Sequence, residues 1–405
     1  MSAVTAPAMD RPPPPPPMTV GTLGWLRQNL FSSWVNSLVT VVLAVVVGWA
    51  VIGLISWVIV TADWLVITSR VQLYLVGLYP QVDAWRPQVA VLLISALLGV
   101  SWRSWGGTAR GFAVGLSAVA VIVGVIPHGL QPLNRILVLA IPVAVGVGYF
   151  LAAGFFAGRP RRIVGAAFLA VFVGLLIIRG IEGVPGLEPV NTNDVGGLLL
   201  NLLLALFGIA ASMPIGIALA LGRQSNLPVV KWACVAFIEI IRGVPLITLL
   251  FMSRHILPLT FPENIKIDTL YITGITIMLF SSAYMAENVR GGMAAVAPGQ
   301  TEAARALGLR GWQTTLLITL PQGLRNIIPA IVGQFISLFK DTSLVFIIGM
   351  LDLVEMGRVT IQSNLEFVDN GREVYLFIAV VFWIFCFSMS YVSRRIERAL
   401  GVGKR

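Results

Sequence analysis

The chain has 405 residues, of which 57% are hydrophobic and only 11% are charged, and its mean hydropathy is +0.88. A soluble domain carries about 25% charged residues, so this composition argues against a soluble enzyme or a nucleic-acid-binding module and predicts a membrane protein. The formal net charge of +10 is explained below by the positions of the basic residues and needs no nucleic-acid partner.

Residues 1–34 form the first predicted region, a proline-rich tail. It contains the run Pro12 to Pro17. Consecutive prolines favour an extended polyproline II conformation and cannot enter a helix, so we expect a disordered cytoplasmic segment. A ligand for a proline-recognising domain is the alternative interpretation.

Ten segments then approach the length of about 20 apolar residues that a membrane-spanning helix requires. The second of them is the least apolar and depends on Trp102 and Trp105 as anchors at the membrane interface. The predicted spans are 35–60, 88–104, 111–127, 133–157, 163–179, 195–221, 231–253, 269–288, 322–350 and 373–393.

The charges orient these spans. With a cytoplasmic N-terminus, 18 basic residues fall in cytoplasmic segments and 8 in the opposite loops, whereas 3 acidic residues are cytoplasmic and 12 are not. Basic loops remain on the cytoplasmic side, so we predict a multi-pass membrane protein with both termini in the cytoplasm.

The spans fall into two groups. Residues 35–180 form plain apolar spans, whereas spans in region 195–393 contain Glu239, Arg242, Glu287, Lys340 and Asp341. A charge at the centre of a membrane costs about 2.5–3.5 kcal/mol, so such residues usually face a cavity or a partner. We therefore expect function in the second group, and packing, a partner surface or a docking platform in the first.

The cytoplasmic segment 290–321 contains the most specific motif. Glu302-Ala303-Ala304 is followed at fixed spacing by Gly308, Ile318 and Leu320-Pro321. This pattern resembles the EAA loop of type I ABC importer permeases. Pro298 and Gly308 should delimit a short helix, because proline suits a first helical turn and glycine suits the left-handed residue after a last turn.

The resemblance implies that this loop docks on a cytoplasmic ABC ATPase dimer through Glu302, Ala303, Ala304, Arg305 and Gly308. The alanines keep the helix surface small, and Glu302 and Arg305 can pair with the partner. An amphipathic helix lying on the membrane is the alternative, but it would not require this spacing.

Further motifs resemble polar amino-acid permeases, namely Ile241 to Leu246, Ala283 to Gly292, Gly299-Gln300 and Lys340 to Leu344. Tyr79-Pro80 and Trp85-Arg86-Pro87 resemble the M-type permease subunit of general L-amino-acid ABC importers. The resemblance implies an all-α polytopic protein: a type I ABC permease core of five helices at 195–393, about five extra N-terminal spans, and a basic cytoplasmic tail at 394–405.

The resemblance also implies a location in a bacterial inner membrane and a set of partners. They are a second, related but different permease chain, the ATPase dimer, a periplasmic amino-acid-binding protein, an L-amino acid as substrate and the lipid bilayer. The chain lacks a phosphate-binding loop, so ATP should bind to the partner ATPase, and no cofactor or catalysis is expected in this chain. Two separated histidines and two cysteines within apolar stretches predict no metal site.

Lys340, Asp341, Thr342, Ser343 and Glu287 are the candidate substrate-binding residues. An amino acid needs an acceptor for its ammonium group, which Asp341 can supply, and donors for its carboxylate, which the other three residues of this run can supply. Alternatively, Lys340 and Asp341 neutralise each other. Glu287 can instead pair with Arg290.

Three other polar features are expected to be structural. Glu239 and Arg242 are spaced to pair with each other on one helix face or to bind the backbone around Pro245, and Asn201 and Ser212 should form hydrogen bonds between helices.

Two other functions were weighed against a permease. An ion-coupled secondary transporter could use Glu287 or Asp341 as its coupling site, but such carriers commonly contain internal repeats, and the charged motifs have no second copy in the first half. A membrane scaffold would gain nothing from ionisable residues within its spans.

Overall fold

The computed structural model describes residues 21–125, 130–154, 156, 159–262 and 267–401. Within these ranges the regular structure is helical, apart from one isolated bridge between Gly197 and Asp352. The chain forms two compact units, which end and begin at Asp63 and Trp64 and are described separately.

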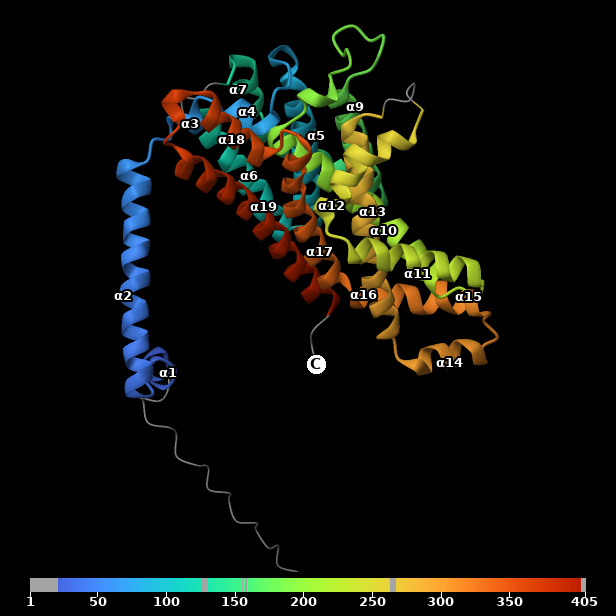
Figure 1. Ribbon diagram of the computed structural model, residues 1–405. Helices are drawn as coiled ribbons and strands as arrows, with labels where there is room; N and C mark the ends of the chain where they lie inside the picture. Colours follow the sequence, from blue (N-terminus) through green and yellow to red (C-terminus); the bar gives the residue numbers. More distant parts are fainter. Residues whose placement is uncertain (1–20, 126–129, 155, 157–158, 263–266, 402–405) are drawn as a thin grey trace, which may run out of the picture. The chain divides into compact units, whose positions relative to one another are not determined.

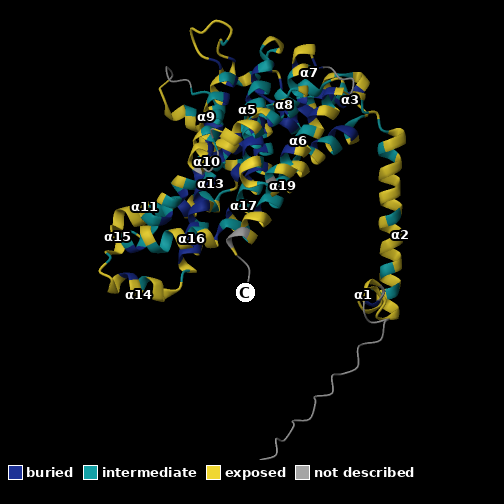
Figure 2. Ribbon diagram, turned by 180° about the vertical axis from the view of Figure 1, so that it is seen from behind, coloured by how far each residue is buried: buried dark blue, intermediate teal, exposed yellow. Residues whose placement is uncertain are grey.

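The first unit contains three helical elements: α1 (Thr22–Asn29), α2 (Trp34–Ser56) and the π-helical turn η2 (Trp57–Thr61). Ser33 starts α2 by accepting a hydrogen bond from the Asn36 N–H (3.2 Å), which satisfies one of the free donors of a first helical turn. No residue of α2 is buried, and Figure 2 shows it largely exposed. The predicted disordered tail 1–34 is therefore wrong from residue 22 onward, because residues 22–29 form the helix α1 and α2 begins at Trp34. Pro12 to Pro17 lie outside the described residues.

The second unit begins with short helices and a bundle. Its elements up to residue 194 are α3 (Leu65–Thr68), α4 (Val71–Val76), η3 (Gln81–Asp83), α5 (Trp85–Trp105), α6 (Gly107–Val125), α7 (Pro132–Leu139), α8 (Ile141–Gly154), α9 (Pro160–Arg179) and η4 (Thr192–Asp194). Glycines let α5 and α8 meet closely, because a Cβ added to Gly99 would lie 2.0 Å from the carbonyl oxygen of Val145. Small residues at such crossings allow dispersion contacts between backbones in a membrane.

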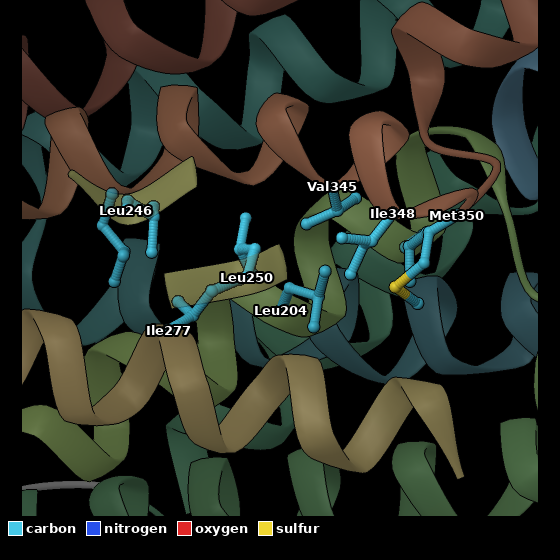
Figure 3. Packing of buried hydrophobic residues seen from close by; sticks show 9 residues of the cluster. Leu204, Leu246, Leu250, Ile277, Val345, Ile348 and Met350 are labelled. Carbon is cyan, nitrogen blue, oxygen red and sulfur yellow. The ribbon is translucent and has the colours of Figure 1, made fainter. Parts of the chain in front are cut away.

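The remainder of the second unit contains α10 (Gly197–Arg223), α11 (Pro228–Gly243), α12 (Leu246–Phe251), η5 (Met252–Ile256), η6 (Leu257–Thr260), α13 (Thr269–Ala294), α14 (Pro298–Ala306), α15 (Gly311–Thr314), η7 (Thr315–Thr319), α16 (Leu320–Asn326), α17 (Ile328–Asp341), η8 (Thr342–Ile348), α18 (Leu353–Ser363), η9 (Leu365–Phe367) and α19 (Gly371–Leu400). Leu204, Leu250, Ile277 and Val345, from α10, α12, α13 and η8, are buried together in its core (Figure 3).

Eight of the described helical stretches are long and apolar enough to span a membrane. They are Trp34–Thr61, Gln81–Trp105, Pro132–Gly154, Arg161–Arg179, Gly197–Arg223, Thr269–Ala294, Ile328–Ile348 and Gly371–Arg398. The predicted span 111–127 corresponds to α6, whose apolar stretch Ala109–Val125 is shorter than these.

The predicted span 231–253 is not one straight helix. It divides into Pro228–Gly243 and Leu246–Thr260, which are bent by 104° at Val244-Pro245. Proline lacks the N–H that would continue the helical hydrogen bonds, and the residue before it avoids the helical conformation. The motif Arg242-Gly243-Val244-Pro245 therefore redirects the chain.

Different helices lie at the two ends of the second unit. Figure 1 shows α3, α4, α7 and α18 at one end and α14, α15 and the C-terminal end of α19 at the other. We call them the outer and inner ends, after the side predicted from the charges.

Arg86, which is 1% exposed, connects the first turn of α5 to the acidic loop 182–194 at the outer end. It pairs with Asp83 (2.7 Å) and donates hydrogen bonds to the carbonyl oxygens of Glu188 (2.8 Å) and Gly186 (3.2 Å).

Candidate functional site

Polar groups of α13 and α17 meet inside the second unit. The Asn288 side-chain amide donates a hydrogen bond to the side-chain oxygen of Gln334 (2.6 Å). The Gln334 amide in turn donates to the backbone carbonyl oxygen (2.7 Å) and the hydroxyl (3.1 Å) of Ser281. Hydrogen bonds of this kind hold membrane helices together. Polar side chains within a membrane also line the paths that polar solutes use. Gln334 was not predicted from the sequence, because an uncharged amide within an apolar span is a weak signal.

A second polar cluster lies where η8 and α18 meet α10. The Asn201 amide donates to the hydroxyl of Thr342 (3.0 Å) and to a carboxylate oxygen of Asp352 (3.3 Å), and its oxygen accepts from the Leu353 N–H (3.0 Å). The side chains of Asn201, Thr342 and Asp352 are completely buried. The predicted helix-to-helix bonding of Asn201 is confirmed, whereas that of Ser212 is wrong, because its hydroxyl donates to Ile209 of the same helix (3.3 Å).

Asp352 is a structural residue that sequence reasoning missed. Its carboxylate accepts hydrogen bonds from the N–H groups of Val354 (3.2 Å) and Glu355 (3.0 Å) and so caps α18. Burial raises its pKa to about 6, more than these hydrogen bonds and that from Asn201 lower it. The available signal was an aspartate followed three residues later by Glu355, a pattern typical of a helix start.

The predicted substrate residues Lys340 to Ser343 do not converge on one point. The Thr342 hydroxyl donates to the carbonyl oxygen of Phe339 (2.7 Å), and the Ser343 hydroxyl donates to that of Lys340 (2.8 Å). Lys340 is exposed and Asp341 is half-buried, and no ion pair joins them in the described part of the chain. The hydroxyl protons are thus committed to the backbone, while the two charged groups do not form an ion pair with each other in the described residues.

Glu287 lies at the centre of a charged network near the inner end. Its carboxylate forms ion pairs with Arg290, with Arg223 (3.4 Å) and with Arg242 (3.7 Å). The predicted pair of Glu287 with Arg290 is confirmed. The predicted pairing of Glu239 with Arg242 is wrong: Glu239 pairs with Arg223 (2.9 Å).

This network joins three helices. Arg223 ends α10, Arg242 lies in the last turn of α11 just before the bend at Pro245, and Glu287 and Arg290 belong to α13. The guanidinium group of Arg242 also lies over the Tyr284 ring, 5.5 Å from its centroid. Because the contacts depend on how α11 packs against α10 and α13, spacing along one helix could not predict them.

The loop that follows α13 has the predicted helical form. α14 begins at Pro298 and ends at Ala306, and Gly308 adopts the left-handed conformation with φ +81°. Glu302 and Arg305 are exposed, and Leu307 is 83% exposed. The expected role of Ala304 in the exposed surface is wrong: it is 3% exposed and packs against its own chain.

The chain matches known proteins along most of its length. Residues 212–402 match the family of the binding-protein-dependent transport system inner membrane component. Over 94% of this chain and 93% of the relative, it is 36% identical to the inner membrane amino-acid ABC transporter permease protein YhdY of Escherichia coli. It is 35% identical to the glutamate/glutamine/aspartate/asparagine transport system permease protein BztC of Rhodobacter capsulatus, over 97% of this chain and 96% of that protein.

Among solved structures, a crystal structure of an amino acid ABC transporter with histidines covers 50% of this chain and 92% of the matched chain. The two sequences are 30% identical, and the TM-score is 0.46.

Proposed function

We infer that this chain, which belongs to the family of binding-protein-dependent transport system inner membrane components, is a permease subunit of an ABC importer for amino acids. The observation that carries the proposal is α14, a short helix between Pro298 and the left-handed Gly308 that presents charged side chains at the inner end. Both full-length relatives named above are amino-acid permeases, which supports amino acids as the cargo.

The free energy of ATP hydrolysis would reach this chain through contacts between the ATPase and α14. Glu302 and Arg305 are exposed and have no ion pair within the described residues, so they are available to an ATPase dimer that binds and hydrolyses ATP. Ala303 adds little bulk to the same surface, Ala304 anchors the helix to its own chain, and Gly308 turns the chain away. This chain then performs no catalysis and holds no cofactor.

The remaining partners follow from the same role. A second permease chain, related but different, would complete the path across the bilayer, and a periplasmic binding protein would deliver L-amino acids to the outer end. Both termini would be cytoplasmic, because basic residues gather toward the inner end and acidic residues toward the outer end.

Within the path, Asp341 is the proposed acceptor for the substrate ammonium group and Lys340 the proposed donor to its carboxylate. No ion pair joins the two groups within the described residues, which leaves both able to contact a substrate. Ser343 would contribute as a hydroxyl acceptor, since its proton is committed to the carbonyl oxygen of Lys340. Thr342, which is completely buried and accepts a hydrogen bond from Asn201, would hold this run in position instead of contacting the substrate. Glu287 would act as a gate residue that holds three arginines at the inner end.

Reconstituted transport tests the proposal against ion coupling. The complex of permeases and ATPase, placed in liposomes with the binding protein outside and ATP inside, should accumulate a labelled amino acid. A protonophore and a sodium ionophore should leave the initial rate unchanged. Uptake without ATP that either ionophore abolishes would instead identify an ion-coupled secondary transporter.

Asp341→Asn is expected to reduce uptake by about tenfold to a hundredfold, because a hydrogen bond to a charged group contributes about 1.5–3 kcal/mol. The amide has the same size, so the amount of assembled complex should remain that of the wild type. Asp369→Asn, which removes one exposed carboxylate from the outer end, is the matched control and should transport normally. A loss of uptake no larger than the loss of assembled complex would contradict the substrate role.

A further inference from the structure

An apolar groove of about 620 Å³ lies among α5, α6 and α8, outside the part of the chain that matches the family. Its lining includes Trp102 of α5, Ala113, Ser117 and Val121 of α6, and Gly146 of α8. The Ser117 hydroxyl donates to the carbonyl oxygen of Ala113 (2.7 Å), so it offers no free proton to a ligand. The groove therefore suits a hydrocarbon chain.

Two arginines lie where the groove meets the inner end. α5 ends at Trp105 and α6 begins at Gly107, so Arg103 and Arg110 flank one short turn. Arg110 precedes Ala113 and Ser117 by three and seven residues, which places it on the same face of α6 as the groove. The Arg103 guanidinium group lies 5.0 Å from the centroid of the Tyr149 ring, one turn beyond Gly146 on α8.

The charge at this turn is not neutralised by the chain. No carboxylate in the described residues forms an ion pair with Arg103 or Arg110. Arg395 of α19 adds a third guanidinium group, since its Nη1 would lie 3.5 Å from a Cβ placed on Gly107. It is held there by the Tyr391 hydroxyl, to which it donates a hydrogen bond (2.8 Å).

We propose that this groove binds an anionic phospholipid of the cytoplasmic leaflet, with an acyl chain between α6 and α8 and the phosphate between Arg103 and Arg110. Such a lipid supplies in one molecule the hydrocarbon that the groove accepts and the negative charge that its inner mouth lacks. A helix of a partner protein would fill the groove but would leave the arginines unpaired. This lipid site goes beyond the proposed transport function. It assigns a ligand to the N-terminal helices α5, α6 and α8.

The test uses the complete transporter in nanodiscs that contain equal amounts of phosphatidylglycerol and phosphatidylcholine. Native mass spectrometry after partial delipidation measures which lipids remain bound. The wild type should retain phosphatidylglycerol in preference. The double change Arg103→Gln with Arg110→Gln should lower that preference by about 30-fold, since each basic residue contributes about fivefold to anionic-lipid binding. Arg161→Gln with Arg398→Gln removes the same charge elsewhere at the inner end and should leave the preference unchanged.

A second variant fills the groove instead. Gly146→Leu should abolish retention of the bound lipid and still fold, because a Cβ at Gly146 meets no atom within 4 Å. Gly115→Leu is its control, since that position is equally open but does not line the groove. The proposal is wrong if the arginine pair can be removed without loss of preference, if Gly146→Leu retains the lipid, or if a cysteine at Ala118 cross-links to the second permease while no lipid is retained.

Discussion

Gly308→Asp is expected to abolish ATP-driven uptake while the permease still assembles in the membrane. Gly308 has φ +81°, a conformation that costs a residue with a side chain about 1–3 kcal/mol. An added Cβ would meet no atom of its own chain within 4 Å, so the cost is local and the fold should persist. In the complex, however, the distorted turn and a new carboxylate would lie against the proposed ATPase surface. ATP hydrolysis and amino-acid uptake measured on the same liposomes check the prediction.

Gly311→Asp is the matched control for that change. Gly311 has equally open surroundings, its φ is not positive, and it begins α15, where an acidic side chain is favourable. Its uptake should be close to the wild-type rate. Normal uptake by Gly308→Asp would exclude this loop as the coupling element. Equal losses in the two variants would exclude the left-handed turn at Gly308 as the cause of the defect.

Features that depend on local backbone geometry were predictable from the sequence. The bounds of α14 were predictable because Pro298 and Gly308 act through their own backbone conformations, which neighbours in space do not change. The pair of Glu287 with Arg290 was predictable for the same reason, since residues three apart on a helix are adjacent. Both features depend only on local geometry.

Contacts between helices were not predictable in this way. Arg223 was assigned to a cytoplasmic loop by its position, yet it extends α10 and pairs with Glu239 and Glu287. Asp352 was one acidic residue of an outer loop, yet it is completely buried beside Asn201. In each case the partners are at least 16 residues apart and meet only because the helices pack, which no single-helix period encodes.

The network around Glu287 is expected to have a large effect on assembly, because one carboxylate pairs with three arginines. Glu287→Gln should destabilise the complex by about 3 kcal/mol, because it leaves three partly buried guanidinium groups without their common carboxylate. That cost is at the low end for a buried pair, since the Glu287 side chain is 25% exposed. Thermal unfolding of the purified complex measures the change. Glu239→Gln should alter stability by less than about 1 kcal/mol, since Glu239 is 54% exposed and has one such partner.

A double change separates a structural gate from a substrate ligand. Arg290→Gln combined with Glu287→Gln removes a positive charge whose only ion pair in the described residues is with Glu287, and it should recover part of the lost stability, because the remaining guanidinium groups then repel each other less. If Glu287 holds the inner end together, uptake per assembled complex should recover in step with stability. If Glu287 instead binds the ammonium group of the cargo, Glu287→Gln should raise KM for uptake with stability unchanged, and the second change should restore nothing. Recovery of stability without recovery of uptake would show that the carboxylate does both, since only the charge on Glu287 can accept a cation within a path of low dielectric constant.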